Sequence, residues 1–103
     1  MSDCQVIAHN PGPRWQRGVD LAQQPGVGDH IATMKGWLDA GRLVLGGPFL
    51  DGRGGGMAVV RFDSVDAALD AALADPAVQA GLLTVTVRRW FPGMSADGME
   101  LDI

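Results

Sequence analysis

A histidine and an aspartate, far apart in the chain, carry the side chains that acid–base chemistry uses. His30 lies close to Met34 and Trp37, and Asp75 stands directly before Pro76. Histidine changes charge near neutral pH, and a carboxylate that meets its ring holds one tautomer in place. Each residue alone also fits a structural role, a histidine at the edge of the core and an aspartate in a turn. A catalytic pair therefore requires that the two side chains meet in space.

The other reactive side chains are weaker candidates. His9 follows an early apolar run, and Cys4, the single cysteine, fits core filling better than nucleophilic catalysis. Neither histidine has further ligands at the close spacings of a metal site, so we expect no metal and no organic cofactor. Ser64 and Ser95 lack the glycine-flanked context of a serine nucleophile.

The glycine-rich segment of residues 41–57 separates two apolar runs and has two interpretations. Such a segment can cradle phosphate through backbone N–H groups, or it can turn the chain where side chains would clash. It lies between two expected strands and lacks the Gly-Lys-Ser/Thr ending of a phosphate loop. We therefore expect residues 54–56 to turn a hairpin, and Gly46, Gly47 and Pro48 to shape a pocket wall.

The elements that position these residues follow from hydrophobic periodicity and from turn residues. The pattern predicts helices over residues 29–40 and 64–74, and strands over residues 5–9, 43–45, 58–62 and 82–90. Asp29 and Ser64 are suitable N-caps, and Asp75 before Pro76 ends the second helix. Residues 14–27 form a long polar loop between the first strand and the first helix.

One face of the first predicted helix gathers His30 with Ile31, Met34 and its apolar neighbours. Lys35 lies on the opposite face or at the margin. An apolar wall beside the histidine would shield a bound substrate from water.

The order strand-helix-strand-strand-helix-strand predicts a ferredoxin-like α+β fold, a four-stranded antiparallel sheet with two helices on one face. The strands are apolar on both sides, since Met57 and Val59 alternate with Ala58 and Val60. No further element remains to cover the second face. We therefore expect a homodimer in which two sheets face each other.

Length and composition limit the class of protein. The 103 residues predict one domain over residues 1–103, with a core from about residue 4 to 91 and a tail over 92–103. A formal charge of −4 argues against sequence-independent binding of nucleic acid. No uninterrupted apolar stretch approaches the ~20 residues that span a bilayer, and no signal peptide is visible. We expect a cytoplasmic protein without membrane or nucleic-acid partners.

Several short motifs occur together in a specific order. They are His30 with a helix ending at Gly41, then Gly41-Arg42-Leu43-Val44-Leu45-Gly46-Gly47-Pro48-Phe49, Gly55-Gly56-Met57, Asp75-Pro76-Ala77-Val78 with Ala80-Gly81, and Val87-Arg88-Arg89-Trp90. With this set the chain resembles the YciI-like (YCII-related) family of the dimeric α+β barrel superfamily. The resemblance covers about residues 6–90.

This resemblance implies a ferredoxin-like fold that dimerises through its sheets, and a pocket with a His30–Asp75 dyad. Relatives with a known reaction are similar to dehydrochlorinases of chlorinated hydroxyquinols, and muconolactone-isomerase-type proteins share the fold more distantly. One branch is named for an Asp-Gly-Pro-Phe motif, but here Gly46 stands in place of that Asp. The segment Pro11-Gly12-Pro13-Arg14-Trp15 resembles only a subset of the family and is expected to line the same pocket.

The leading hypothesis is a small cofactor-independent enzyme of lyase (dehydrochlorinase) or isomerase type, acting on a small cyclic or aromatic substrate. His30 would be the general acid/base, Asp75 would orient it, and the Gly47 backbone would hydrogen-bond a developing oxyanion. The expected substrate-binding residues are Trp15, Met34, Trp37, Gly46, Gly47, Pro48 and Met57. The alternatives are a non-catalytic small-molecule-binding or accessory dimer, and a quinol or haem-related monooxygenase, for which the sequence shows no dedicated feature.

Overall fold

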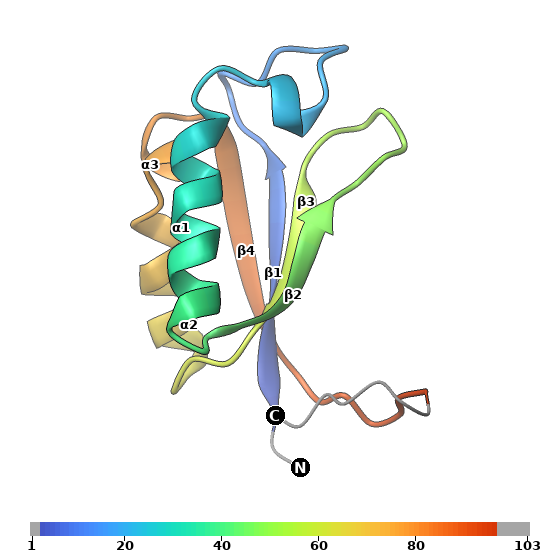
Figure 1. Cartoon of the computed structure of the whole chain (residues 1–103), viewed down its shortest axis with the longest axis vertical. Helices are drawn as coiled ribbons and strands as arrows, with labels where there is room; N and C mark the ends of the chain where they lie inside the picture. The colour runs from blue at the N-terminus through green and yellow to red at the C-terminus, as the bar shows by residue number, and fades with distance from the viewer. Residues whose placement is uncertain (1–2, 97–103) are drawn as a thin grey trace.

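The computed structural model describes residues 3–96, which form one four-stranded antiparallel sheet with helices on one face (Figure 1). The sheet order is β2-β3-β1-β4, with β1 in the centre paired to both β3 and β4. The strands are β1 (Cys4–Pro11), β2 (Leu43–Pro48), β3 (Gly56–Val60) and β4 (Leu83–Trp90). This arrangement confirms the predicted ferredoxin-like α+β fold.

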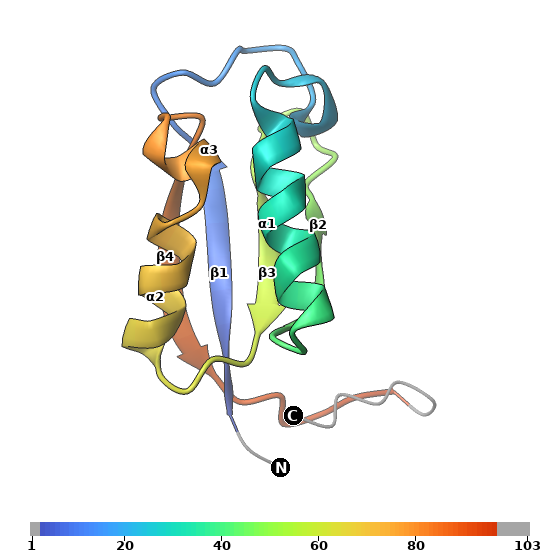
Figure 2. The ribbon, with the colours of Figure 1, turned by 60° about the vertical axis from the view of Figure 1, so that its left-hand side comes forward.

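The helices are α1 (Val27–Asp39), α2 (Val65–Leu73), the short α3 (Pro76–Gln79) and a 3₁₀ helix, η1 (Leu21–Gln23). Figure 2 shows α1 beside the α2–α3 pair, both in front of the sheet. Ser64 caps α2 as predicted, because its side chain accepts the N–H of Ala67. The short helix α3 was not predicted from the sequence pattern. Its start is favoured by Pro76 in the first turn, where proline already has a helical φ and no N–H is needed.

Two predicted boundaries were wrong. The first helix begins two residues before Asp29, and its N-cap is Gly26, whose φ of 89° lies in the left-handed region. Asp29 occupies the first turn, where a negative charge suits the positive end of the helix dipole. The second strand continues through Gly46, Gly47 and Pro48, which pair with the beginning of β3. The hairpin connection is therefore shorter than the glycine-rich segment suggested.

The main core lies between the sheet and the helices. Its buried members are Ile7, Ala58, Val60, Ala68 and Ala72, and the partly buried residues around them are Met34, Trp37, Leu43, Phe62, Val85 and Val87. Because side chains alternate along a strand, His9 lies on the same face of β1 as Ile7. In the register of the sheet His9 stands opposite Gly56, and Gly56 stands opposite Pro48. Between Pro48 on β2 and His9 on β1, this row therefore has no side chain at Gly56.

The loop that was expected to be long and polar is tied down by one buried amide. Gln24 donates from its side chain to the carbonyls of Gln16 and Val19, and it accepts the N–H of Gln16 at 2.8 Å. Trp15 and Leu21 pack against a second buried cluster, formed by Ala77, Leu82 and Leu83. The loop therefore holds η1 against the body of the domain.

The sheet face away from the helices carries exposed apolar residues, including Leu45, Met57 and Trp90. The predicted sheet-to-sheet homodimer stays a prediction at this point. No helix within residues 3–96 is both long and apolar enough to cross a membrane. Of the predicted tail over 92–103, residues 97–103 lie outside the described part of the chain.

Candidate active site

His30 and Asp75 meet. The Nδ1 atom of His30 lies 2.6 Å from Oδ2 of Asp75, and the two residues are only 7% and 1% exposed. The other carboxylate oxygen, Oδ1, accepts the N–H of Ala77 at 2.9 Å. Asp75 thus caps α3 and contacts the imidazole at the same time.

The chain brings this pair together from two helices that pack beside each other. His30 belongs to the beginning of α1, which contacts α3. Asp75 sits between α2 and α3 in an extended conformation, with φ of −60° and ψ of 123°. The following proline disfavours helical angles at this position, which separates the two helices and leaves the carboxylate free to cap the second.

A second imidazole completes the cluster. The ring of His9, from β1, lies edge-to-face against the ring of His30, with centroids 4.9 Å apart and an angle of 71° between the planes. His9 is 3% exposed, and its Nε2 atom is buried without a hydrogen-bond partner among the described residues. The pKa of His9 is lowered from 6.5 to about 4, mainly by burial and also by the neighbouring His30, while Asp75 partly opposes both. His9 is therefore neutral at physiological pH.

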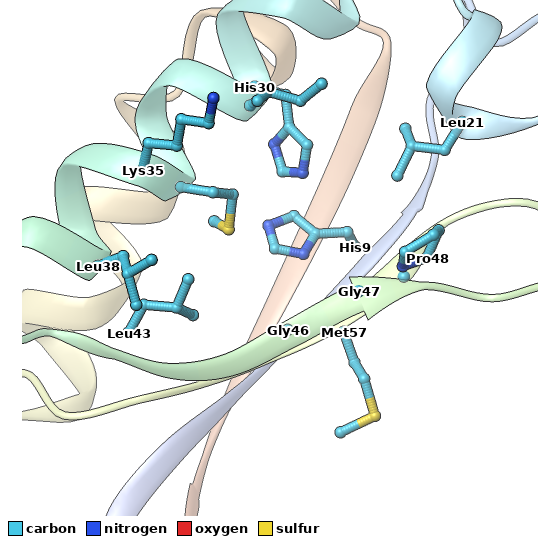
Figure 3. Close-up of a pocket in the computed structure, with 13 residues that line it drawn as sticks. His9, Leu21, His30, Lys35, Leu38, Leu43, Gly46, Gly47, Pro48 and Met57 are labelled. Atoms are coloured by element: carbon cyan, nitrogen blue, oxygen red, sulfur yellow. The ribbon is translucent and has the colours of Figure 1, made fainter.

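The two histidines face a small apolar cavity between α1 and the β2–β3 edge of the sheet (Figure 3). Its volume is about 220 Å³. Lys35 is exposed and contributes the one ammonium group among the lining residues. The residues that line it are His9, Leu21, His30, Ile31, Met34, Lys35, Leu38, Leu43, Gly46, Gly47, Pro48, Gly56 and Met57.

Of the predicted substrate-binding residues, Met34, Gly46, Gly47, Pro48 and Met57 line this cavity. The side chain of Met57, however, points away from the two histidines, toward the other side of the sheet (Figure 3). Gly47 lies opposite Met57 in the β2–β3 ladder, and a Cβ added there would meet nothing within 4 Å. Gly46, which lies opposite Ala58, carries no side chain on the cavity side, whereas a Cβ at Gly47 would point to the same far face as Met57.

The two predicted tryptophans lie elsewhere. Trp15 covers the end of the β2–β3 hairpin, where a Cβ added to Gly54 would come within 2.6 Å of its ring. Trp37 packs edge-on against Phe62 in the main core, with ring centroids 5.3 Å apart. The structure brings neither of them to the cavity wall.

Several lining residues were missed because no local pattern identifies them. Leu21 enters from η1, a single turn inside a loop that looked irregular. Lys35 was placed opposite the apolar face or at its margin, yet it lines the cavity together with Ile31 and Leu38, which follow the same side of α1. The register of Gly56 with His9 could be known only once the sheet was assembled.

The same cluster has the residue types of a metal site. His9, His30 and Asp75 offer ligand atoms that all lie within 4.8 Å of one another. Both carboxylate oxygens of Asp75 are engaged, one by His30 Nδ1 and one by Ala77 N–H. A metal ion bound by all three side chains would have to replace the His30–Asp75 hydrogen bond. We therefore derive no chemical step through a metal.

An antiparallel α+β sheet with a buried His–Asp pair beside a small apolar cavity defines a ferredoxin-like protein with a candidate acid–base site. The family model described as YCII-related domain matches residues 13–91. The chain therefore belongs to the YCII-related family, as the sequence resemblance predicted. A search of curated proteins gives no match.

Proposed function

We propose that this protein is a cofactor-independent acid–base enzyme with His30 as the proton-transferring group. The observation that carries the proposal is the buried hydrogen bond between His30 Nδ1 and Asp75 Oδ2 at the wall of an apolar cavity. A histidine held by a carboxylate through one nitrogen presents the other nitrogen in a defined direction.

The pairing assigns roles to the two nitrogens of the ring. With Asp75 accepting Nδ1–H, the lone pair of His30 Nε2 is the proton acceptor. His30 removes a proton from a carbon next to a carbonyl, the C–H electron pair becomes the C=C bond of an enolate, and the carbonyl oxygen takes the negative charge. The imidazolium that forms is stabilised by Asp75 and returns its proton in the next step.

The size and lining of the cavity support a small substrate of limited polarity. About 220 Å³ accommodates a single-ring compound, and Met34, Leu38 and Leu43 supply apolar contacts. Return of the proton to another carbon gives an isomerase, and loss of a leaving group such as chloride from the enolate gives a lyase. We propose a small cyclic or aromatic carbonyl or enol compound as the substrate class.

The second candidate is a non-catalytic binding protein of the same fold. It is favoured by the apolar character of the cavity, which would hold a small molecule without any proton transfer. In either case we propose a cytoplasmic homodimer in which the sheet faces that carry Leu45, Met57 and Trp90 cover each other. This pairing would bury apolar strands on both sides, as in other two-layer packings.

Proton exchange separates the two candidates without knowledge of the natural substrate. A panel of cyclic ketones is incubated in D₂O with the wild-type protein, and loss of the α-proton signals is followed by NMR. We expect His30→Gln to lower the rate for any active ketone by about 10²–10⁴-fold, the usual contribution of general base catalysis. Thr33→Ala, on α1 with its hydroxyl bonded to the Asp29 carbonyl, is the control for changes in the helix itself.

Asp75→Asn should reduce the rate less than His30→Gln, because the base remains and only its orientation and charge partner change. Full activity in His30→Gln would contradict the proposed function. Binding of ketones without exchange in the wild type would favour the binding protein.

A further inference from the structure

His9 contributes a buried polar atom that no hydrogen bond among the described residues explains. Its Nε2 atom has no hydrogen-bond partner among the described residues, although nearly all buried polar groups in proteins have one. Leaving such a group unpaired destabilises a fold, so an apolar side chain would serve the core better. A bound ligand could supply the missing partner.

The position of His9 beside His30 suggests a specific role in the reaction. Its ring lines the same cavity as His30 and touches the His30 ring edge-to-face at 4.9 Å. The two rings come from different elements, β1 and α1, so their separation is set by the packing of the helix on the sheet. A substrate group that reaches His30 Nε2 is therefore next to His9 as well.

We propose that His9 is a second catalytic residue, which donates an Nε2–H hydrogen bond to the substrate oxygen that becomes negative when His30 removes the proton. This inference rests on the proposed function. No proton is transferred from His9, and the hydrogen bond strengthens as charge moves from the C–H bond to the oxygen. His9 takes the role that the sequence analysis gave to the Gly47 backbone.

The protonation of His9 suits this role. A pKa lowered to about 4 keeps the ring neutral, so it donates without first losing a proton to the enolate. The groups that face it from the neighbouring elements are His30 and Asp75, and their combined effect is part of that pKa. The Nε2 atom is enclosed as the ring now lies, so this role requires rotation about the Cβ–Cγ bond, a broad torsion in histidine.

The role requires a ligand with one oxygen placed beside the acidic C–H or O–H group, rather than a purely apolar molecule. 4-Nitrophenol is a suitable probe, because its phenolate oxygen resembles that of an enolate and its absorbance reports ionisation. The chain contains two histidines, so a protein labelled with ¹⁵N-histidine gives just two ring systems in NMR. His9→Phe assigns them.

We expect 4-nitrophenol to bind as the phenolate and to move the Nε2 proton of His9 downfield. His9→Phe, similar in shape but without a donor, should weaken this binding by about 10- to 100-fold, the usual effect of a hydrogen bond to a charged group. His9→Gln keeps an N–H donor and should restore part of the affinity. Asn10→Ala, an exposed neighbour on β1, is the control and should bind like the wild type.

The midpoint of thermal unfolding distinguishes the proposed role from a purely structural one, because the two roles predict opposite changes. His9→Phe removes an unpaired buried nitrogen and should raise the midpoint of thermal unfolding while it weakens phenolate binding. A lower midpoint with unchanged binding would assign His9 to the fold and overturn the proposal.

Three further results would overturn it. They are equal phenolate affinity in His9→Phe and the wild type, no binding up to the solubility of the probe, and stoichiometric Zn²⁺ binding that shifts both rings and blocks the probe. Failure of the proposed function looks different. In that case His30→Gln leaves ketone exchange unchanged, whatever happens to phenolate binding at His9.

Discussion

At the scale of single residues, Asp75 connects the fold to the site. One of its oxygens caps α3 through Ala77 N–H, and the other binds His30, all within a region closed to solvent. Removal of the carboxylate leaves a buried N–H on each side without a partner. We expect Asp75→Ala to lower the free energy of unfolding by about 3 kcal/mol or more, measured by urea denaturation.

The matched variant Asp75→Asn separates the two contributions. Its side-chain oxygen can still accept the Ala77 N–H, so the cap persists while the charged partner of His30 is lost. It should therefore be destabilised less than Asp75→Ala. Equal losses in the two variants would show that the cap contributes little and that the His30 contact accounts for the whole effect.

His9 makes stability depend on pH in a defined window. Its pKa is lowered from 6.5 to about 4 in the folded protein, so between these values the unfolded chain binds a proton that the folded chain does not. The titration of His9 therefore leaves stability unchanged above pH 6.5, and stability falls as the pH decreases toward 4. The full loss below that range is about 3 kcal/mol.

Urea denaturation of the wild type and His9→Phe across this range measures the effect. The difference between the two curves removes the contribution of the carboxylates that both proteins share. We expect the difference in unfolding free energy to grow as the pH falls. Parallel curves would mean that His9 titrates normally in the folded protein.

At the scale of elements, the end of the β2–β3 hairpin depends on close backbone approach to β1. Gly55 has φ of 76°, and a Cβ there would overlap the carbonyl oxygen of His9. Gly55→Ala should cost about 2 kcal/mol or more and displace His9, because an L residue is strained at this φ and the overlap is with backbone.

Gly47→Ala is the control for this prediction. Gly47 has no positive φ, and a Cβ there would meet nothing within 4 Å, so the same substitution should be tolerated in the fold. Thermal unfolding measures both variants, and the His9 ring signals show the displacement. If Gly55→Ala unfolds with the wild-type midpoint, the tight approach of the hairpin to β1 is not required.

The sequence predicted the order of the elements because each strand and helix carries a local periodicity and a local stop, such as Asp75 before Pro76. It also identified His30 and Asp75 as a pair, through the family resemblance, but their contact depends on the packing of α1 against α3. Trp37 was expected at the pocket because it shares a helix face with His30, and Trp15 because its loop resembles part of the family. Packing partners far away in the chain place both elsewhere. The Nε2 atom of His9 lacks a hydrogen-bond partner among the described residues because of how distant elements pack around it, and no local sequence pattern contains this information.

At the scale of the whole molecule, the helix-free face of the sheet leaves apolar side chains exposed in a single chain. Leu45, Met57 and Trp90 are between 38% and 43% exposed there. A second copy of the same face would cover these residues, and a stable pairing of this kind buries about 800 Å² on each partner. The proposed homodimer thus follows from the surface that folding leaves uncovered.

Trp90→Glu should therefore convert the proposed dimer to a monomer. A carboxylate placed between two apolar sheets loses its hydration without gaining a partner, which should raise the dimer dissociation constant by on the order of 100-fold or more. Leu73→Glu is the matched control, since Leu73 is similarly exposed, at 44%, but lies on α2, away from this face. Light scattering coupled to size-exclusion chromatography gives the mass of each variant. A monomeric wild type would contradict the proposed homodimer, and a Trp90→Glu variant that remains dimeric while Leu73→Glu dissociates would place the contact between subunits on another surface.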